Sequence, residues 1–166
     1  MSQTMPWWTG TVIYQLIVRS FADGNGDGIG DFKGLASRLP YLRWLGVKTL
    51  WLTPTYPSPL RDGGYDITDF QDIHPDLGDL ASFHRFLTAA HSQGMRVILD
   101  LVLNHTSDLH PWFQRARWAP KGSTERDVYV WSDDPSRFCD ALADTHVPIS
   151  LTGWWLRHHR LQRHSP

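Results

Sequence analysis

The stretch that most constrains the fold is Arg96-Val-Ile-Leu-Asp-Leu-Val-Leu-Asn-His105, an almost continuous apolar run that ends in polar residues. A run of branched apolar side chains predicts a strand buried on both faces, as in a parallel sheet. In parallel α/β folds, ligands bind beyond the carboxyl ends of the strands. We therefore expect Asn104 and His105 to face a ligand, with Asp100 as an acid inside the strand. The alternative interpretation is a capped strand with a surface histidine.

Composition sets broad limits on the class of protein. The chain has 166 residues, of which 41% are hydrophobic and 20% charged, as in one globular domain. Its net charge of −1 gives no electrostatic reason to expect nucleic acid or an anionic membrane as a partner. The amino terminus lacks the pattern of a signal peptide, and no run approaches the roughly 18 apolar residues of a membrane span. A single cysteine, Cys139, excludes a disulfide framework, so we expect a cytoplasmic protein.

The other periodic segments alternate between strand and helix patterns. Residues 11–18 and 47–52 are predicted strands, and residues 79–93 are a predicted helix with Asp79 as its N-cap and Gly94 beyond its end. Residues 32–45 have helical spacing, but Pro40 predicts a kink or a short turn before the helix, and Gly46 predicts its end. Repeated βα units predict a parallel sheet with right-handed crossovers.

A glycine-rich acidic loop follows the first predicted strand. Asp23, Asn25, Asp27 and Asp31 alternate with glycines that let the backbone curl, so that their oxygens can converge on calcium or magnesium. An EF-hand is disfavoured because its twelfth position, which needs a bidentate acid, falls on Gly34. The acids would also repel a phosphate, which disfavours a dinucleotide fold. The alternative is a turn whose polar side chains satisfy one another.

Four motifs together resemble the amino-terminal part of the catalytic domain of glycoside hydrolase family 13, the α-amylase family. They are Val12-Ile-Tyr-Gln15, the acidic loop 23–31, Asp62-Gly-Gly-Tyr-Asp66, and Asp100-Leu-Val-Leu-Asn-His105. Within the family, residues 58–66 are most similar to the trehalose synthase branch, which isomerises maltose to trehalose. Oligo-1,6-glucosidases and related α-glucosidases are the near alternative.

The resemblance implies an α/β fold that comprises the first three βα units of a (β/α)8 TIM barrel and is incomplete. Residues 7–104 would be the amino-terminal part of the barrel, and residues 105–138 the start of a domain inserted between strand 3 and helix 3. Residues 152–166 resemble nothing in the family, and no acid occurs after Asp144. This change of composition suggests that residues 139–166 are an aberrant tail from a frameshifted or prematurely ended reading frame. The adjacent His158 and His159 are poorly placed to share a metal ion, and Cys139 is expected to be inert.

The resemblance also implies roles for particular residues. It places a maltose-like oligosaccharide against Asp62, Tyr65 and His105, with Tyr65 stacked under a glucose ring and the other two bonded to its hydroxyls. Asp100 and Asn104 would fix the loop around His105. A structural calcium or magnesium ion would be held by the loop side chains and one backbone carbonyl, namely Asp23, Asn25, Asp27, Ile29 and Asp31.

The residues that perform the chemistry in this family are expected to be absent. A retaining mechanism needs an Asp nucleophile and a Glu acid/base, which the family takes from later strands, and a barrel needs roughly 250 residues. We therefore assign no catalytic residue and expect a fragment that is inactive alone and poorly soluble because its sheet edges are open. The alternatives are a sugar- and metal-binding remnant, or one piece of a split enzyme completed by a second, carboxyl-terminal chain.

Overall fold

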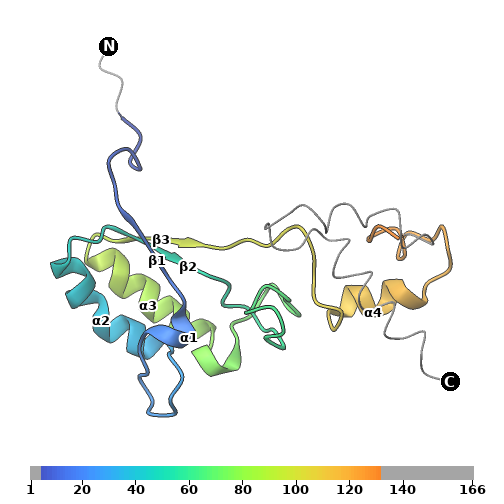
Figure 1. Ribbon diagram of the computed structural model, residues 1–166, viewed down its shortest axis with the longest axis horizontal. Coiled ribbons are helices and arrows are strands. Elements are labelled where there is room, and N and C mark those ends of the chain that lie inside the picture. The colour runs from blue at the N-terminus through green and yellow to red at the C-terminus, as the bar shows by residue number, and fades with distance from the viewer. Residues whose placement is uncertain (1–4, 132–166) are drawn as a thin grey trace, which may run out of the picture. The chain divides into compact units, whose positions relative to one another are not determined.

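The computed structural model describes residues 5–131, which fall into two compact units that meet between Val102 and Leu103 (Figure 1). The predictions for the tail 139–166, including Cys139, His158 and His159, lie outside the described residues. In the described part, no helix is long and apolar enough to cross a membrane.

The first unit alternates strands and helices in the predicted order. It contains β1 (Ile13–Leu16), α1 (Val18–Phe21), α2 (Phe32–Trp44), β2 (Thr49–Leu52), the 3-10 helix η1 (Pro75–Leu77), α3 (Leu80–Ser92) and β3 (Arg96–Leu99). The second unit contains α4 (Pro111–Trp118). The short helices α1 and η1 were not predicted, since neither is long enough to show a period in the sequence.

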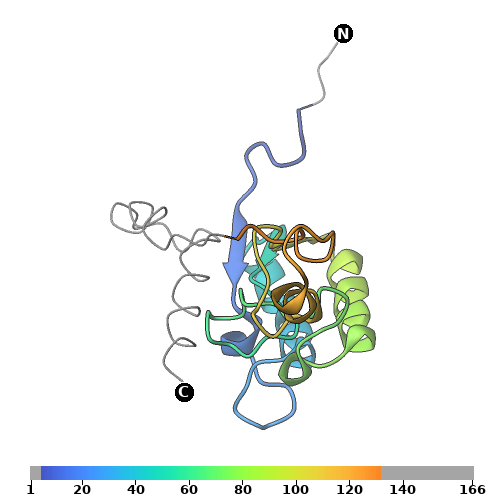
Figure 2. The same ribbon diagram turned by 90° about the vertical axis from the view of Figure 1, so that its right-hand side faces the viewer.

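The three strands form one parallel sheet in the order β1-β2-β3. The register pairs Leu16 with Leu52 and Leu52 with Leu99, so the carboxyl ends of the strands are level. Helices α2 and α3 lie side by side against one face of this sheet (Figures 1 and 2). The predicted parallel α/β arrangement is confirmed.

The core lies between β2 and the two helices. Its fully buried side chains include Leu35, Leu39 and Leu42 of α2, Phe86 of α3 and Leu50 of β2. The spacing of the three leucines places them on one stripe of α2, as the sequence predicted. Packing of this stripe against the sheet fixes the loops that follow the strands.

The prediction for the third strand was partly wrong. β3 ends at Leu99, so Asp100 lies just beyond the strand and not inside it. Arg96 and Leu99 are exposed, and only Val97 packs on the core. The reason is that β3 pairs with β2 alone within residues 5–131, and an edge strand is covered on fewer sides than an interior one.

Helix α2 runs without interruption through Pro40, and no separate turn precedes it. Its amino end is capped by the buried Asp31, whose Oδ1 accepts a hydrogen bond from the Gly34 N–H (2.6 Å). Its carboxyl end is closed as predicted: Gly46 has a φ of 88° and donates its N–H to the carbonyl of Arg43 (3.0 Å).

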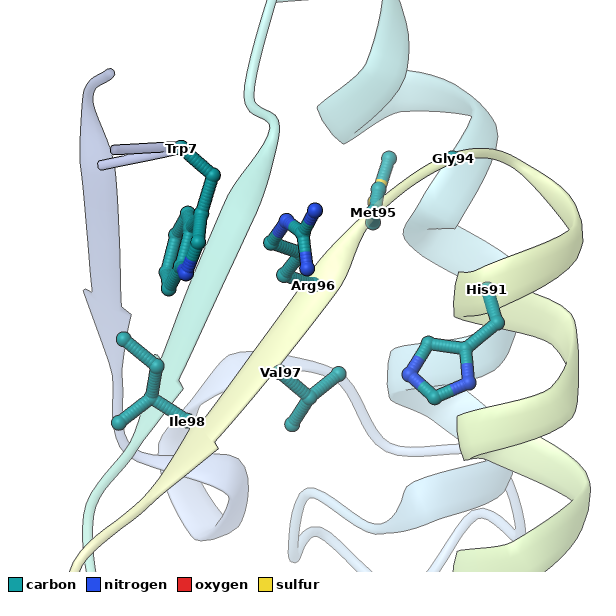
Figure 3. Close-up of a pocket in the computed structure, with 7 residues that line it drawn as sticks. All are labelled: Trp7, His91, Gly94, Met95, Arg96, Val97 and Ile98. Atoms are coloured by element: carbon teal, nitrogen blue, oxygen red, sulfur yellow. The ribbon is translucent and has the colours of Figure 1, made fainter. Parts of the chain in front are cut away.

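A cavity of about 480 Å³ lies at the amino end of β3, at the opposite end of the strand from Asp100. Figure 3 shows Trp7, Arg96 and Ile98 on one side of the strand and Val97 with His91 of α3 on the other. The guanidinium of Arg96 lies 4.7 Å from the centre of the Trp7 ring, a cation–π contact. Trp7 thus covers the amino end of the sheet, away from the residues predicted to bind sugar.

Candidate functional site

The carboxyl ends of the strands meet at one edge of the sheet. The Asp100 N–H donates to the Leu52 carbonyl (3.2 Å), and the Thr53 N–H donates to the Leu16 carbonyl (3.2 Å). The residues that follow β1, β2 and β3 therefore begin at the same level. This edge is where ligands bind in parallel α/β folds.

Asp100 organises this edge. Its Oδ1 accepts a hydrogen bond from the indole N–H of Trp51 (2.6 Å), and its Oδ2 accepts one from the hydroxyl of Tyr65 (2.8 Å). The Tyr56 hydroxyl donates to the backbone carbonyl of Asp100 (3.2 Å). Bonds to a charged acceptor are stronger than neutral ones. Asp100 therefore holds the ring of Tyr65, the side chain predicted to stack on the sugar.

The electrostatics of the edge keep this tyrosine protonated. Burial raises the pKa of Tyr65 to about 12, with further contributions from its hydrogen bond to Asp100 and from the negative charges of Asp100 and Asp62. Burial, with the charge of Asp100, also raises the pKa of Tyr56. At neutral pH, Tyr65 therefore offers a hydroxyl that donates a hydrogen bond and an apolar ring face. The carboxylate of Asp62 lies close enough for its charge to raise the pKa of Tyr65.

The loop that carries Asp62 and Tyr65 is internally bonded. Asp66 is 2% exposed and accepts hydrogen bonds from the Ser58 hydroxyl (2.5 Å) and from the Arg61 N–H (3.0 Å). The Tyr65 N–H donates to the carbonyl of Asp62 (3.0 Å). A loop ordered in this way loses little conformational entropy when a ligand binds.

His105 belongs to the second unit. Its ring is half-buried, and the Asn104 side-chain nitrogen lies 3.4 Å from its Nδ1, the pairing expected if Asn104 orients the ring. The structure thus brings Asp62 and Tyr65 together within the first unit and pairs Asn104 with His105 in the second. A role for His105 at the same sugar stays a prediction.

The acidic loop 23–31 extends away from the sheet between α1 and α2 (Figures 1 and 2). The two oxygens of Asp23 accept hydrogen bonds from the N–H groups of Asn25, Gly26 and Gly28 (2.6–3.0 Å), and these backbone bonds lower the pKa of Asp23. Asp27 accepts from the Asn25 side chain (2.9 Å) and from the Ile29 N–H (2.7 Å).

These contacts are compatible with a hard cation. The carboxylate and amide oxygens keep unused lone pairs, and this donor chemistry suits calcium. Within residues 5–131, no group of three or more His, Cys, Asp or Glu side chains is placed to hold a metal ion by itself. A bound ion would therefore depend on Asn25 and the Ile29 carbonyl as well as the acids. The calcium or magnesium site stays a prediction.

Residues 15–154 match the family of the α-amylase catalytic domain. The chain belongs to the α-amylase family. The three parallel strands and the helices α2 and α3 are accordingly part of a (β/α) barrel, as predicted. The matched range extends into the segment that we predicted to be an aberrant tail, and the boundary at residue 139 stays a prediction.

Several relatives are close in sequence. The chain is 53% identical over 135 residues to a trehalose synthase of Pimelobacter, covering 81% of this chain and 23% of the relative. It is 48% identical to a Thermus thermophilus trehalose synthase (96% and 17%) and 50% identical to a Pediococcus pentosaceus α-glucosidase (79% and 23%). The chain thus spans about a quarter or less of the length of these relatives.

Solved structures show the same fold. The trehalulose synthase MutB is 46% identical, with a TM-score of 0.74 over 78% of this chain and 23% of that one. The trehalose-6-phosphate hydrolase of Bacillus licheniformis is 45% identical, also with a TM-score of 0.74 over 78% of this chain and 23% of that one. Mutants of MutB have been crystallised with glucose, isomaltulose and sucrose.

Sequence reasoning missed the partners of Asp100. The sequence carried no signal for them, because two features of the tertiary structure bring them together. The strand register pairs Trp51 with Ile98, two residues before Asp100, and the path of the loop after β2 places Tyr56 and Tyr65.

Proposed function

We propose that this chain supplies the sugar-holding part of an enzyme that acts on α-glucosides, of the trehalose synthase type. The observation that carries the proposal is Tyr65, whose hydroxyl is bonded to Asp100 and whose ring is held at the carboxyl edge of the sheet beside Asp62. A glucose unit offers an apolar C–H face and a rim of hydroxyls. Tyr65 can stack on the face, and Asp62 can accept hydrogen bonds from the rim.

The proposal separates holding from cleaving. Tyr65 has a raised pKa and Asp100 is bonded to two side chains, so neither is arranged as a nucleophile. A retaining mechanism needs two further carboxylates on opposite sides of the bond that breaks. We propose that these come from a part of the barrel beyond the third strand, and that the chain alone does not turn over maltose.

Binding of maltose tests the holding role. Tyr65→Ala is expected to weaken maltose binding about tenfold, because an aromatic contact contributes roughly 0.5–1.5 kcal/mol beyond its area. The measurement is a titration of the monomeric full chain with maltose, in which binding is monitored by saturation-transfer NMR. Tyr41→Ala is the matched control, since Tyr41 lies exposed on the outer side of α2. Equal affinity of the two variants would contradict the proposal.

An α-glucosidase activity is the second candidate, favoured by relatives of that class at 48–50% identity. The two candidates differ in product once the barrel is completed. A chain that carries the remaining strands of a family member is mixed with this chain and maltose. Trehalose as the main product supports the trehalose synthase type, and glucose alone supports the glucosidase. No product from a mixture that forms a stable complex would argue against a complementing role.

We also propose a structural calcium ion in the acidic loop. At 100 times its dissociation constant, calcium is expected to stabilise the fold by about 2.7 kcal/mol, read as a rise in melting temperature. Asp27→Ala should abolish the rise, because this side chain is exposed and serves only the loop. Asp69→Ala, in another exposed loop, should leave it intact. An equal response of the two variants to calcium would refute the site.

A further inference from the structure

The second unit contains a small pocket of about 240 Å³, lined by none of the residues proposed to hold sugar or calcium. Helix α4 forms one wall with Trp112 and Arg115, and the segment after α4 forms the other with Glu125 and Val128. Sites for drug-sized ligands span roughly 300–1,000 Å³, so this pocket has room for a single small ring.

The wall that carries Glu125 and Val128 is tied to α4. The guanidinium of Arg126 donates to backbone carbonyls at the end of that helix (3.2–3.5 Å), those of Ala116, Arg117 and Ala119. The same guanidinium lies 3.8 Å from the centre of the Trp131 ring, and Phe113 of α4 stacks on that ring (6.1 Å). The two walls are therefore held at a fixed separation.

The side chain of Trp112 packs against His110 and is otherwise largely exposed. Its backbone N–H donates to Nδ1 of the buried His110 (3.1 Å), which caps α4, and the indole ring itself meets the His110 ring edge to face at 5.0 Å. Even so, the Trp112 residue is 53% exposed. An aromatic ring that is both rigid and exposed is suited to stack on a ligand at low entropic cost.

The polar groups of the pocket favour an uncharged ligand. Arg115 and Glu125 are both exposed, and within residues 5–131 the side chain of neither makes a hydrogen bond or an ion pair. Their opposite charges cancel, which disfavours a phosphate or a cation as ligand. A guanidinium and a carboxylate can together donate to and accept from neighbouring hydroxyls.

We infer that this pocket is a second hexopyranose site, in which a glucose unit stacks on Trp112 and bonds to Arg115 and Glu125 through its hydroxyls. The inference rests on the proposed function for the class of ligand. It differs from the Tyr65 site in unit and in residues, so a sugar can bind to one site while the other is disabled.

Indole signals in ¹H–¹⁵N NMR spectra of the monomeric full chain test the inference. Glucose and maltose should shift the Trp112 signal saturably, and should do so equally in the Tyr65→Ala variant. The signal of Trp118 should not move, since this exposed residue lies on the same helix outside the pocket, beneath Arg117. The Trp112 signal is assigned by its loss in Trp112→Phe.

Substitutions in the pocket complete the test. In the Tyr65→Ala background, Glu125→Gln and Arg115→Met should each weaken binding about tenfold, and Trp112→Ala should abolish it. If the Trp112 signal does not shift on addition of sugar while maltose still binds at Tyr65, this inference is overturned and the proposed function stands. A Trp112 signal that shifts with protein concentration instead of sugar would assign the surface to contacts between copies and would also overturn it.

Discussion

Replacing Asp100 by asparagine is expected to lower the pKa of Tyr65 from about 12 toward its usual 10.0. The substitution removes one of the two negative charges that oppose ionisation of the phenol, although burial, the largest cause, remains. The tyrosinate absorbance of the full chain, titrated with base, measures this pKa. Tyr65→Phe identifies the Tyr65 step in the titration, and Asp127→Asn, at an exposed position, is the charge-matched control.

The raised pKa of Tyr65 also makes the stability of the fold depend on pH, with a loss of stability at high pH. In the unfolded chain the phenol ionises near pH 10.0, whereas in the folded chain it stays protonated to about pH 12. Its contribution to the free energy of unfolding is therefore complete below pH 10 and is lost as the pH rises through about 12. Asp100→Asn should lower the pH at which this contribution is lost, measured as the urea midpoint of unfolding at a series of pH values. An unchanged pH dependence of the urea midpoint would mean that Asp100 does not act on Tyr65.

Asp100→Ala is expected to be far more damaging than Asp100→Asn. It leaves the Trp51 N–H and the Tyr65 hydroxyl without their acceptor, and bonds to a charged group are worth roughly 1.5–3 kcal/mol each. We expect a loss of about 3 kcal/mol in the free energy of unfolding, together with weaker maltose binding. A loss below about 1 kcal/mol would show that water replaces the carboxylate freely.

Replacing Gly34 by alanine is expected to be strongly destabilising. Gly34 lies in the first turn of α2, where the intrinsic preference of alanine predicts stabilisation by about 1 kcal/mol. A Cβ at this position would overlap the backbone carbonyl of Ala22. Backbone cannot rotate away as a side chain can, so the helix and the acidic loop would have to separate.

We therefore expect Gly34→Ala to destabilise the fold and not to stabilise it. The expected loss in the free energy of unfolding is about 3 kcal/mol, the upper end of the usual range for overpacking. The measurement is urea denaturation followed by circular dichroism. Gly26→Asn is the matched control: an added Cβ there meets nothing within 4 Å, and asparagine tolerates the φ of 88°. Gly34→Ala with a midpoint at or above that of the parent chain would contradict the packing of the loop on α2.

The sequence by itself determined the order of strands and helices and where along the chain the residues proposed to hold the sugar lie. Helical spacing and the glycine stop signals of α2 and α3 were readable because they are local properties of the backbone. The acidic loop and the motif around Asp62 and Tyr65 were readable for the same reason, since each is continuous in sequence.

Only the tertiary structure decided which side chains Asp100 holds. Trp51, Tyr65 and Asp100 are far apart in sequence, and the parallel register and the path of the loop after β2 bring them together. The pocket on α4 depends in the same way on how residues 119–131 fold back. Exposure of β3 was also beyond the sequence, because an apolar strand pattern does not reveal which neighbours cover the strand.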